Sequence, residues 1–453
     1  MKHRKLCLPA VAMKHLLAVS VALNVALVLK LMHGGDEGVG WLKVEETLAG
    51  TPKRALQEMS SVVSSGGANG VQNNFESGLQ ELYINLDHGD PTMYESYWKQ
   101  TGDKTTVVLS GWRSISYFSD TRNLCWFLEP DFANAATRLH NLVGNAATEN
   151  YHIVVGTGST QLYQAVLYAQ SPPNTPEPIS VVSATPFYSQ YPLTTDCLKS
   201  GLHKWEGDAN KFDKNRPYIE LVVSPNNPDG SIRQAVVNGT GVLVHDLAYY
   251  WPQYTPISYR ADNDIMLFTV SKCTGHAGTR LGWALVKDEE IAKKMTKFIE
   301  IVSIGVSKES QLRAAKILDV ISDGYEKKES HEENEPFFEF GYKEIGRRWR
   351  QLRAAATGNG KLFSLPDFPT GKCNFSGHEF ETQPAFAWME CKGERDDCEG
   401  FLREHKILTR GGKHFGSSSK YVRVSMIGRE EHFNEFIRRL SVINSLDSPL
   451  TKD

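Results

Sequence analysis

Short, mostly apolar runs separated by longer amphipathic segments predict an α/β fold. Such runs occupy residues 152–156, 218–223 and 265–270, and they are as short as buried strands usually are. Strands alternate with helix-like segments from His152 to about Val286. This alternation predicts a mostly parallel sheet with helices on its faces.

Beyond that sheet the pattern becomes helical over 308–356 and then mixed. The mixed part is predicted to contain a strand, a helix and a strand, at 385–391, 394–405 and 421–426. We therefore predict a large domain over 83–310 and a smaller α+β carboxyl-terminal domain over 311–453, which would close over a substrate.

The amino terminus has a different pattern. The chain is apolar from Leu16 to Leu29 except at Ser20 and Asn24, and the run reaches Met32 if Lys30 extends toward the interface. This gives about 17 residues, close to the lower limit for a membrane span. No clear small-x-small cleavage site follows, so an uncleaved anchor over about 16–32, within residues 1–33, is favoured over a cleaved signal peptide.

The charges around this run predict its orientation. Four basic residues precede it and two follow closely, which places the amino terminus in the cytosol and the remainder of the chain in the lumen. We expect a single-pass protein of the endoplasmic reticulum membrane. Two Asn-x-Ser/Thr triplets, at Asn238 and Asn374, could then be glycosylated. Residues 34–82 are rich in Gly, Ser, Asn and charge and are predicted to be a flexible linker.

Composition excludes several other classes of protein. The net charge of −3 gives no indication of nucleic-acid binding. The seven cysteines are odd in number and include no CxxC pair, so neither a disulfide framework nor a metal site is expected. We interpret them as mostly buried thiols, including Cys273.

The candidate chemistry begins with Lys272, which follows the apolar run 265–270, and Arg280, eight residues later. A lysine in this place can hold an aldehyde as a Schiff base, and an arginine can hold a phosphate. A lysine after a strand is more often a solvated cap, so the pair alone is weak support. The motifs upstream change that interpretation.

Three upstream segments each end an apolar run with polar residues. The turn 156–160, GTGST, suits a phosphate because a helix amino terminus follows it, although such turns also occur for packing alone. The run 218–223 closes into SPNNPDG, an ordinary turn by composition. A third run ends on Asp246, with Tyr249 three residues later, at the strand end where open α/β sheets bind ligands.

In this order the segments resemble pyridoxal-phosphate aminotransferases of fold type I. The phrases NLDHGDPT, NLCWFLEP, VVGTGSTQL, SPNNPDG, HDLAYYWP and SKCTGHAGTRLGW resemble the plant alliinase and tryptophan aminotransferase-related family more narrowly. The similarity extends from about Asn85 to the carboxyl-terminal helix. It implies pyridoxal 5′-phosphate as cofactor, an amino acid and a 2-oxoacid as substrates, and a homodimer.

The resemblance implies a role for each matched residue. Lys272 would bind the cofactor aldehyde and then, as a free amine, move a proton from the substrate Cα. Asp246 would keep the pyridinium nitrogen protonated, and Asn227 and Tyr249 would hydrogen-bond the phenolic oxygen. The implied phosphate ligands are Ser159, Thr160, Ser271 and Arg280.

Three further roles follow from the same resemblance. Tyr188 would stack on the cofactor ring, although Phe187 next to it could take that place. Tyr117 would reach the phosphate of the partner subunit, with a packed aromatic residue as the alternative. Arg423, on an alternating late strand, would bind the substrate α-carboxylate, with a solvent-facing arginine as the alternative.

Three functions compete at this stage. The first is an L-tryptophan:pyruvate aminotransferase that makes indole-3-pyruvate for auxin biosynthesis. The second is an alliinase-like carbon–sulfur lyase acting on cysteine sulfoxides; that branch typically carries a cysteine-rich segment, whereas residues 33–124 contain no cysteine. The third is a membrane-tethered binding protein without catalysis, which would have no need of the whole set around Lys272. Amino-acid specificity rests on the resemblance alone.

Overall fold

The computed structural model describes residues 83–171, 176–213, 215–327, 335–356, 362–393 and 395–446. All of them belong to one compact unit, Glu76–Asp453. The predicted anchor over 16–32 and the linker over 34–82 lie outside the described residues. Within the described ranges, no helix has both the length and the apolar character that a membrane span requires.

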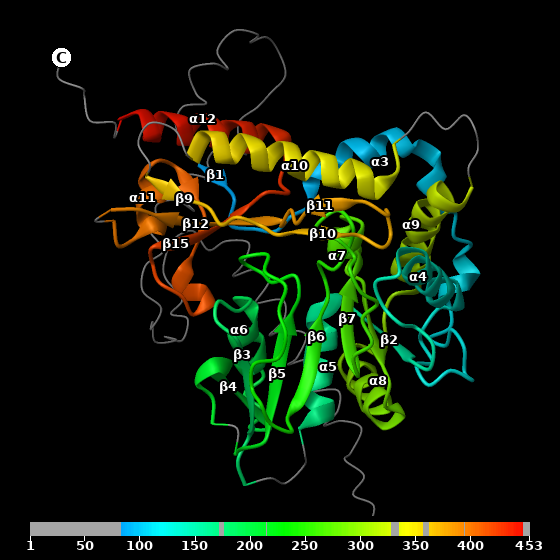
Figure 1. The fold of residues 1–453 in the computed structure, drawn as a ribbon. Coiled ribbons are helices and arrows are strands. Elements are labelled where there is room, and N and C mark those ends of the chain that lie inside the picture. The colour runs from blue at the N-terminus through cyan, green and yellow to red at the C-terminus, as the bar shows by residue number, and fades with distance from the viewer. Residues whose placement is uncertain are drawn as a thin grey trace, which may run out of the picture. The chain divides into compact units, whose positions relative to one another are not determined.

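A seven-stranded sheet forms the centre of the large part (Figure 1). Its strands, in spatial order, are β2 (His152–Gly156), β8 (Gly282–Val286), β7 (Ile265–Thr269), β6 (Val242–Asp246), β5 (Tyr218–Val223), β3 (Ile179–Ser183) and β4 (His203–Asp208). Only β8 runs opposite to its neighbours β2 and β7, and the other neighbouring pairs are parallel. The mostly parallel sheet that the sequence predicts is confirmed.

Helices cover this sheet, and several begin at recognisable capping residues. The Asp288 side chain accepts a hydrogen bond from the Ile291 backbone N–H at 2.8 Å, and two glutamates follow in the first turn of α8. Helix α5 packs against α8, and α4 packs against α9. The helices of this part are α3 (Glu95–Thr101), α4 (Pro130–Val143), α5 (Gly158–Gln170), α6 (Gln190–Asp196), α7 (Val270–Cys273), α8 (Glu289–Ser303) and α9 (Lys308–Glu326).

The remaining part is built on a four-stranded antiparallel sheet. Its strands, in spatial order, are β14 (Arg410–Gly411), β15 (Tyr421–Ser425), β12 (Phe386–Cys391) and β9 (Phe363–Ser364). The long helices α10 (Phe337–Ala356) and α12 (Glu430–Leu446) lie together beside it, and α11 (Cys398–Glu404) follows β12 (Figure 1). Two short pairs complete the strands: β10 (Thr370–Lys372) with β11 (Glu379–Glu381), and β1 (Ile84–Asn85) with β13 (Ile407–Leu408). The division at residue 310 stays a prediction.

The cysteines differ from the expectation at one pair. Cys391, at the end of β12, and Cys398, at the start of α11, form a disulfide with their Cα atoms 5.5 Å apart. The expectation of no disulfide rested on the absence of a CxxC pair and was wrong. The turn between β12 and α11 brings together two cysteines that lie seven residues apart in the sequence. Cys125, Cys273 and Cys373 are buried free thiols, as expected.

A buried polar chain fixes the turn after β6 to helix α4. The Trp283 indole N–H donates to Nε2 of His140 at 3.0 Å, so Nδ1 carries the proton and donates to the Asn145 side-chain oxygen at 2.8 Å. Asn145 in turn donates to the Tyr250 carbonyl at 2.8 Å. A second ring proton on His140 would face the indole N–H, and burial, aided by the charge of Arg260, lowers the pKa of His140 to about 4.

We predict that His140 makes the protein less stable in mild acid. Its folded pKa lies below the value near 6.5 of an unfolded histidine, so between pH 7 and pH 5 the unfolded chain takes up a proton that the native chain does not. Stability therefore falls as the pH falls, by about 2 kcal/mol at pH 5 from this residue.

Urea unfolding at pH 7 and pH 5 tests this prediction. His140→Phe loses two hydrogen bonds and is less stable at pH 7, but its further loss between pH 7 and pH 5 is smaller than that of the wild type by about 2 kcal/mol. His378→Phe, at an exposed position, is the matched control. An equal pH dependence in wild type and His140→Phe would refute the assignment of a neutral buried imidazole.

Candidate active site

A cavity of about 240 Å³ lies where the carboxyl ends of β5, β6 and β7 meet the four-stranded sheet. Of the residues predicted for the site, all but Tyr117 line it. These are Ser159, Thr160, Tyr188, Asn227, Asp246, Tyr249, Ser271, Lys272, Arg280 and Arg423. The parallel strands bring them together because residues that follow such strands meet at one edge of the sheet.

Lys272 stands on the single turn of α7, directly after β7. The Thr269 hydroxyl accepts a hydrogen bond from the Ser271 N–H at 3.2 Å and so begins this turn. The Lys272 ammonium donates to the Gly89 carbonyl at 2.6 Å. Burial, together with the charges of Arg423 and Arg280, lowers the pKa of Lys272 to about 8. An amine with a lowered pKa is more readily available as a nucleophile and a base.

A cradle for an anion lies at the amino terminus of α5. This helix has no side-chain cap at Thr157, so its first N–H groups are free to bind a ligand. Gly158 has a φ of +76°, and a Cβ there would lie 2.7 Å from Nη2 of Arg280. Glycine is therefore required for the arginine to approach the helix end. Together with the hydroxyls of Ser159 and Ser271, which line the same cavity, this donor set fits a phosphate.

Asp246 ends β6 and lines the cavity. Burial raises the pKa of its carboxyl, whereas hydrogen bonds from the Tyr191 hydroxyl, at 2.7 Å, and from the Ala248 N–H, at 3.2 Å, favour the charged form. A buried carboxylate of this kind fits a protonated ring nitrogen. No pattern in the sequence indicates a role for Tyr191, which lies 55 residues from Asp246 along the chain.

Tyr188, rather than Phe187, lines the cavity. Phe187 packs edge-on against Trp205, with ring centroids 4.8 Å apart, and its backbone N–H donates to the Phe415 carbonyl at 3.1 Å. The Tyr188 ring meets the Tyr191 ring edge-on at 5.3 Å. The aromatic neighbour of a cofactor in this cavity would therefore be Tyr188.

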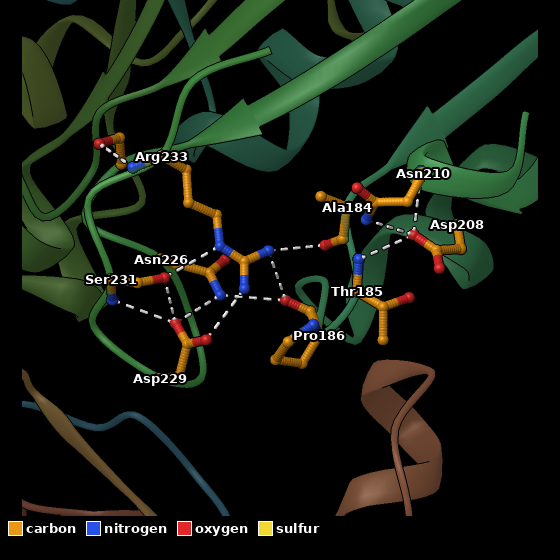
Figure 2. A network of polar contacts seen from close by, with 10 residues as sticks. Ala184, Thr185, Pro186, Asp208, Asn210, Asn226, Asp229, Ser231 and Arg233 are labelled. Atoms are coloured by element: carbon orange, nitrogen blue, oxygen red, sulfur yellow. Dashed lines mark hydrogen bonds and ion pairs between the residues drawn. The ribbon is translucent and has the colours of Figure 1, made fainter. Parts of the chain in front are cut away.

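A polar network joins the loop of Tyr188 to the loop of Asn227 (Figure 2). The Arg233 guanidinium donates to the Ala184 carbonyl at 2.7 Å and to the Pro186 carbonyl at 3.1 Å, and it pairs with Asp229 at 2.9 Å. The Asn226 side-chain amide donates to the Pro186 carbonyl and to the Asp229 carboxylate, at 3.0 and 2.8 Å. These contacts hold the two cavity-lining loops at a fixed separation.

Arg423 lies on β15 and is 3% exposed. Its Nη1 donates to the Asn227 side-chain oxygen at 3.0 Å, and its Nη2 donates to the Asp87 backbone carbonyl at 2.5 Å. The guanidinium also lies 4.1 Å from the centroid of the Phe386 ring. Burial, aided by the charge of Arg410, lowers the pKa of Arg423 to about 10, so it remains a cation at neutral pH. It suits a substrate carboxylate.

Two charged contributors were not predicted from the sequence. Arg410 lines the cavity from β14, and its partner Asp87 lies just after β1. Asp87 and Gly89 belong to the phrase NLDHGDPT, which carried the resemblance without indicating a role for either residue. Arg410 lies in a two-residue strand with no distinctive pattern.

Tyr117 lies outside this cavity. Its side chain is 66% exposed, in a stretch whose other exposed apolar residues are Val108, Trp112, Ile115 and Phe118. The predicted contact of Tyr117 with a partner subunit stays a prediction.

Comparison with known proteins agrees with this geometry. A protein-family model described as allinase matches residues 84–444. The chain is 52% identical over 431 residues to tryptophan aminotransferase-related protein 2 of Arabidopsis thaliana, which covers 94% of this chain and 96% of that protein. It is 35% identical over 370 residues to alliin lyase 1 of Allium sativum, which covers 79% of this chain and 74% of that protein.

Solved structures show the same fold. A mutant aspartate aminotransferase of Thermus thermophilus superposes with a TM-score of 0.57 at 14% identity, covering 87% of this chain and 97% of that one. A substrate-bound BacF structure from Bacillus subtilis gives a TM-score of 0.57 at 18% identity, covering 89% and 100%. The predicted fold type I is confirmed.

The chemistry of the cavity fits pyridoxal 5′-phosphate at three points. It offers an amine at Lys272, an anion cradle at the α5 terminus with Arg280, and a buried carboxylate at Asp246. Each corresponds to one part of the cofactor: the aldehyde, the phosphate and the ring nitrogen. With the family model matching most of its length, the chain belongs to the alliinase family of pyridoxal-phosphate enzymes.

Proposed function

We propose that this protein is an L-tryptophan:2-oxoacid aminotransferase that forms indole-3-pyruvate, with pyruvate as the acceptor, in auxin biosynthesis. The observation that carries the proposal is the 52% identity to a tryptophan aminotransferase-related protein over nearly the full length of both chains. The cavity is consistent with it, because the groups for an amine, a carboxylate and a phosphate converge there.

The proposed mechanism assigns each step to residues of this chain. When bound, the cofactor accepts the electron pair left as a proton leaves the substrate Cα. Lys272 Nζ takes that proton, and its lowered pKa of about 8 makes it a good base near neutral pH. Arg423 orients the substrate through its carboxylate, and Asp246 holds a proton on the ring nitrogen. Tyr188 and Tyr249, whose pKa values burial raises, remain neutral hydroxyls.

A carbon–sulfur lyase is the second candidate. The identity to alliin lyases, 35% over 370 residues for the Allium sativum enzyme, favours it to a lesser degree. The same Lys272 would remove the same proton, and a β-substituent would then leave. The absence of cysteine from residues 33–124 supports the aminotransferase.

We also propose a homodimer and a membrane anchor. The exposed apolar side chains around Tyr117 support the first, because exposed apolar side chains that gather in one stretch of a chain are typical of an interface. The apolar run over 16–32 supports the second and would tether the enzyme to the endoplasmic reticulum, with the catalytic part in the lumen.

The first prediction from the proposed function concerns the reaction. Purified full-length protein incubated with L-tryptophan and pyruvate forms indole-3-pyruvate and alanine in equal amounts. Lys272→Ala lowers this rate roughly a thousand-fold or more, because it removes both the amine that binds the aldehyde and the base. Lys297→Ala, an exposed lysine on α8, is the matched control and retains the wild-type rate.

Different products would decide against this proposal. Ammonia and pyruvate from a cysteine sulfoxide, with no oxoacid from tryptophan, would identify a lyase. A wild-type protein without a visible absorption band after incubation with the cofactor would exclude both enzymes.

The second prediction concerns the dimer. Trp112→Asp places a charge among the exposed apolar side chains of residues 108–118 and shifts the protein toward monomer in analytical ultracentrifugation. Tyr117→Phe leaves the dimer intact but weakens cofactor binding several-fold, because it removes one hydrogen bond to the phosphate. Leu193→Asp, on α6 with 65% of its side chain exposed, is the control. A wild-type monomer would contradict the prediction.

The third prediction concerns the anchor. The full-length protein stays with membranes through alkaline carbonate extraction, whereas a chain that begins at residue 34 is released into the supernatant. Release of the full-length protein, or loss of its first residues from the mature chain, would show instead a peripheral protein or a cleaved signal.

A further inference from the structure

The cavity holds more positive than negative side chains. Its cationic residues are Lys272, Arg280, Arg410 and Arg423, and the one carboxylate among its lining residues is Asp246. A second carboxylate, that of Asp87, does not line the cavity but pairs with Arg410, which does. A cation that already pairs with a carboxylate of the protein is not available to a ligand. The number of anionic groups that the site can bind therefore depends on which cations have such a partner.

Arg410 is fully compensated by this chain. Its Nε and Nη2 donate to the two carboxylate oxygens of Asp87, at 2.5 and 3.0 Å, and its Nη1 donates to the Ser189 hydroxyl at 3.0 Å. The side chains of the pair are 19% and 26% exposed, so water screens the contact only in part. Each nitrogen of this guanidinium thus has a partner, and its charge is neutralised by a two-point ion pair.

Arg423 is held by neutral groups only. Its partners are a side-chain amide oxygen, a backbone carbonyl and the faces of two aromatic rings. Its Nε is buried without a hydrogen-bond partner, and no ion pair joins it to a carboxylate in the part of the chain that the structure describes. A buried cation without a counter-charge is costly, so this site favours one ligand carboxylate.

The two arginines lie directly opposite each other. Residue 410 on β14 pairs with residue 423 on β15, and both side chains line the same cavity. Like charges in this register repel, and the Asp87 carboxylate offsets that repulsion at Arg410. A second ligand carboxylate near Arg410 would meet a guanidinium already occupied, with the negative charge of Asp87 beside it.

We propose that Asp87 is a specificity-determining residue that, by neutralising Arg410, restricts the site to substrates that carry a single carboxylate. This inference rests on the proposed function in one respect, that the substrates are amino acids and 2-oxoacids. It extends that function to a substrate class. The site excludes dicarboxylic substrates, because the Asp87 carboxylate already occupies the Arg410 guanidinium that their second carboxylate would bind.

Substitution of Asp87 tests the proposal with two acceptors. Full-length wild type, Asp87→Asn, Arg410→Gln and the double variant are loaded with cofactor and assayed with L-tryptophan plus either pyruvate or 2-oxoglutarate. The quantity compared is kcat/KM for 2-oxoglutarate divided by kcat/KM for pyruvate. Asp120→Asn is the matched control, because this aspartate is as exposed as Asp87 and also pairs with an arginine, but with Arg122, which is 89% exposed and does not line the cavity.

Asp87→Asn frees the Arg410 guanidinium and raises this ratio at least about ten-fold, mainly through a lower KM for 2-oxoglutarate. Arg410→Gln leaves the Asp87 carboxylate unpaired beside the cavity and lowers the ratio below that of wild type. The double variant loses the gain of Asp87→Asn, and Asp120→Asn leaves the ratio unchanged.

An unchanged or lower ratio in Asp87→Asn that still converts pyruvate overturns the proposal. If Asp87→Asn fails to fold or to develop the absorption band of the cofactor, Arg410→Gln decides, and an unchanged or raised ratio in that variant overturns the proposal.

Failure of the proposed function would look different, because the wild type would then form no oxoacid from tryptophan. In that case the same variants are compared on S-methyl- and S-carboxymethyl-L-cysteine sulfoxide, with pyruvate release as the readout. The quantity compared is then kcat/KM for the S-carboxymethyl substrate divided by kcat/KM for the S-methyl substrate. The proposal expects this ratio to rise in Asp87→Asn and to fall in Arg410→Gln.

Discussion

The site depends on the burial of positive charge. Lys272 and Arg423 both lose part of their basicity because the cavity withdraws them from water, to pKa values of about 8 and about 10. Withdrawing a cation from water costs free energy, and the protein meets this cost differently at the different cations of the cavity. Arg410 receives an internal counter-ion, whereas Lys272 and Arg423 receive only neutral acceptors. The cations without an internal counter-ion are the ones that are left to bind a ligand, so the electrostatics of the cavity follow from where the protein places its few carboxylates.

Much of the fold and of the site could be predicted from the sequence because the informative motifs are local. Asn227, Asp246 and Lys272 each follow an apolar run, and parallel strands bring such positions to one edge whatever the details of packing. The phosphate cradle is equally local, since the turn 156–160 and the first residues of α5 are contiguous. The periodic pattern predicted these strands and turns, and the resemblance to a known family supplied the roles of the residues at their ends.

The remaining contacts depend on tertiary geometry that no local pattern encodes. Tyr191 reaches Asp246 from α6, and Arg410 meets Asp87 across 323 positions of sequence. Phe187 packs against Trp205, which lies on the edge strand β4, and this contact leaves Tyr188 to line the cavity. No local pattern could show which of the two rings Trp205 contacts. The disulfide between Cys391 and Cys398 depends in the same way on the turn that follows β12.

The segment 87–89 unites these observations. The Asp87 carbonyl accepts from Arg423, the Asp87 carboxylate binds Arg410, and the Gly89 carbonyl accepts from Lys272. Three cations of the cavity thus find their acceptors in one short segment of the chain. Strand β1 holds this stretch in place by pairing with β13, and the Leu86 carbonyl accepts from the Ser425 N–H at 2.9 Å on the strand that carries Arg423. The segment that follows β1, where the family match also begins, is therefore part of the active site.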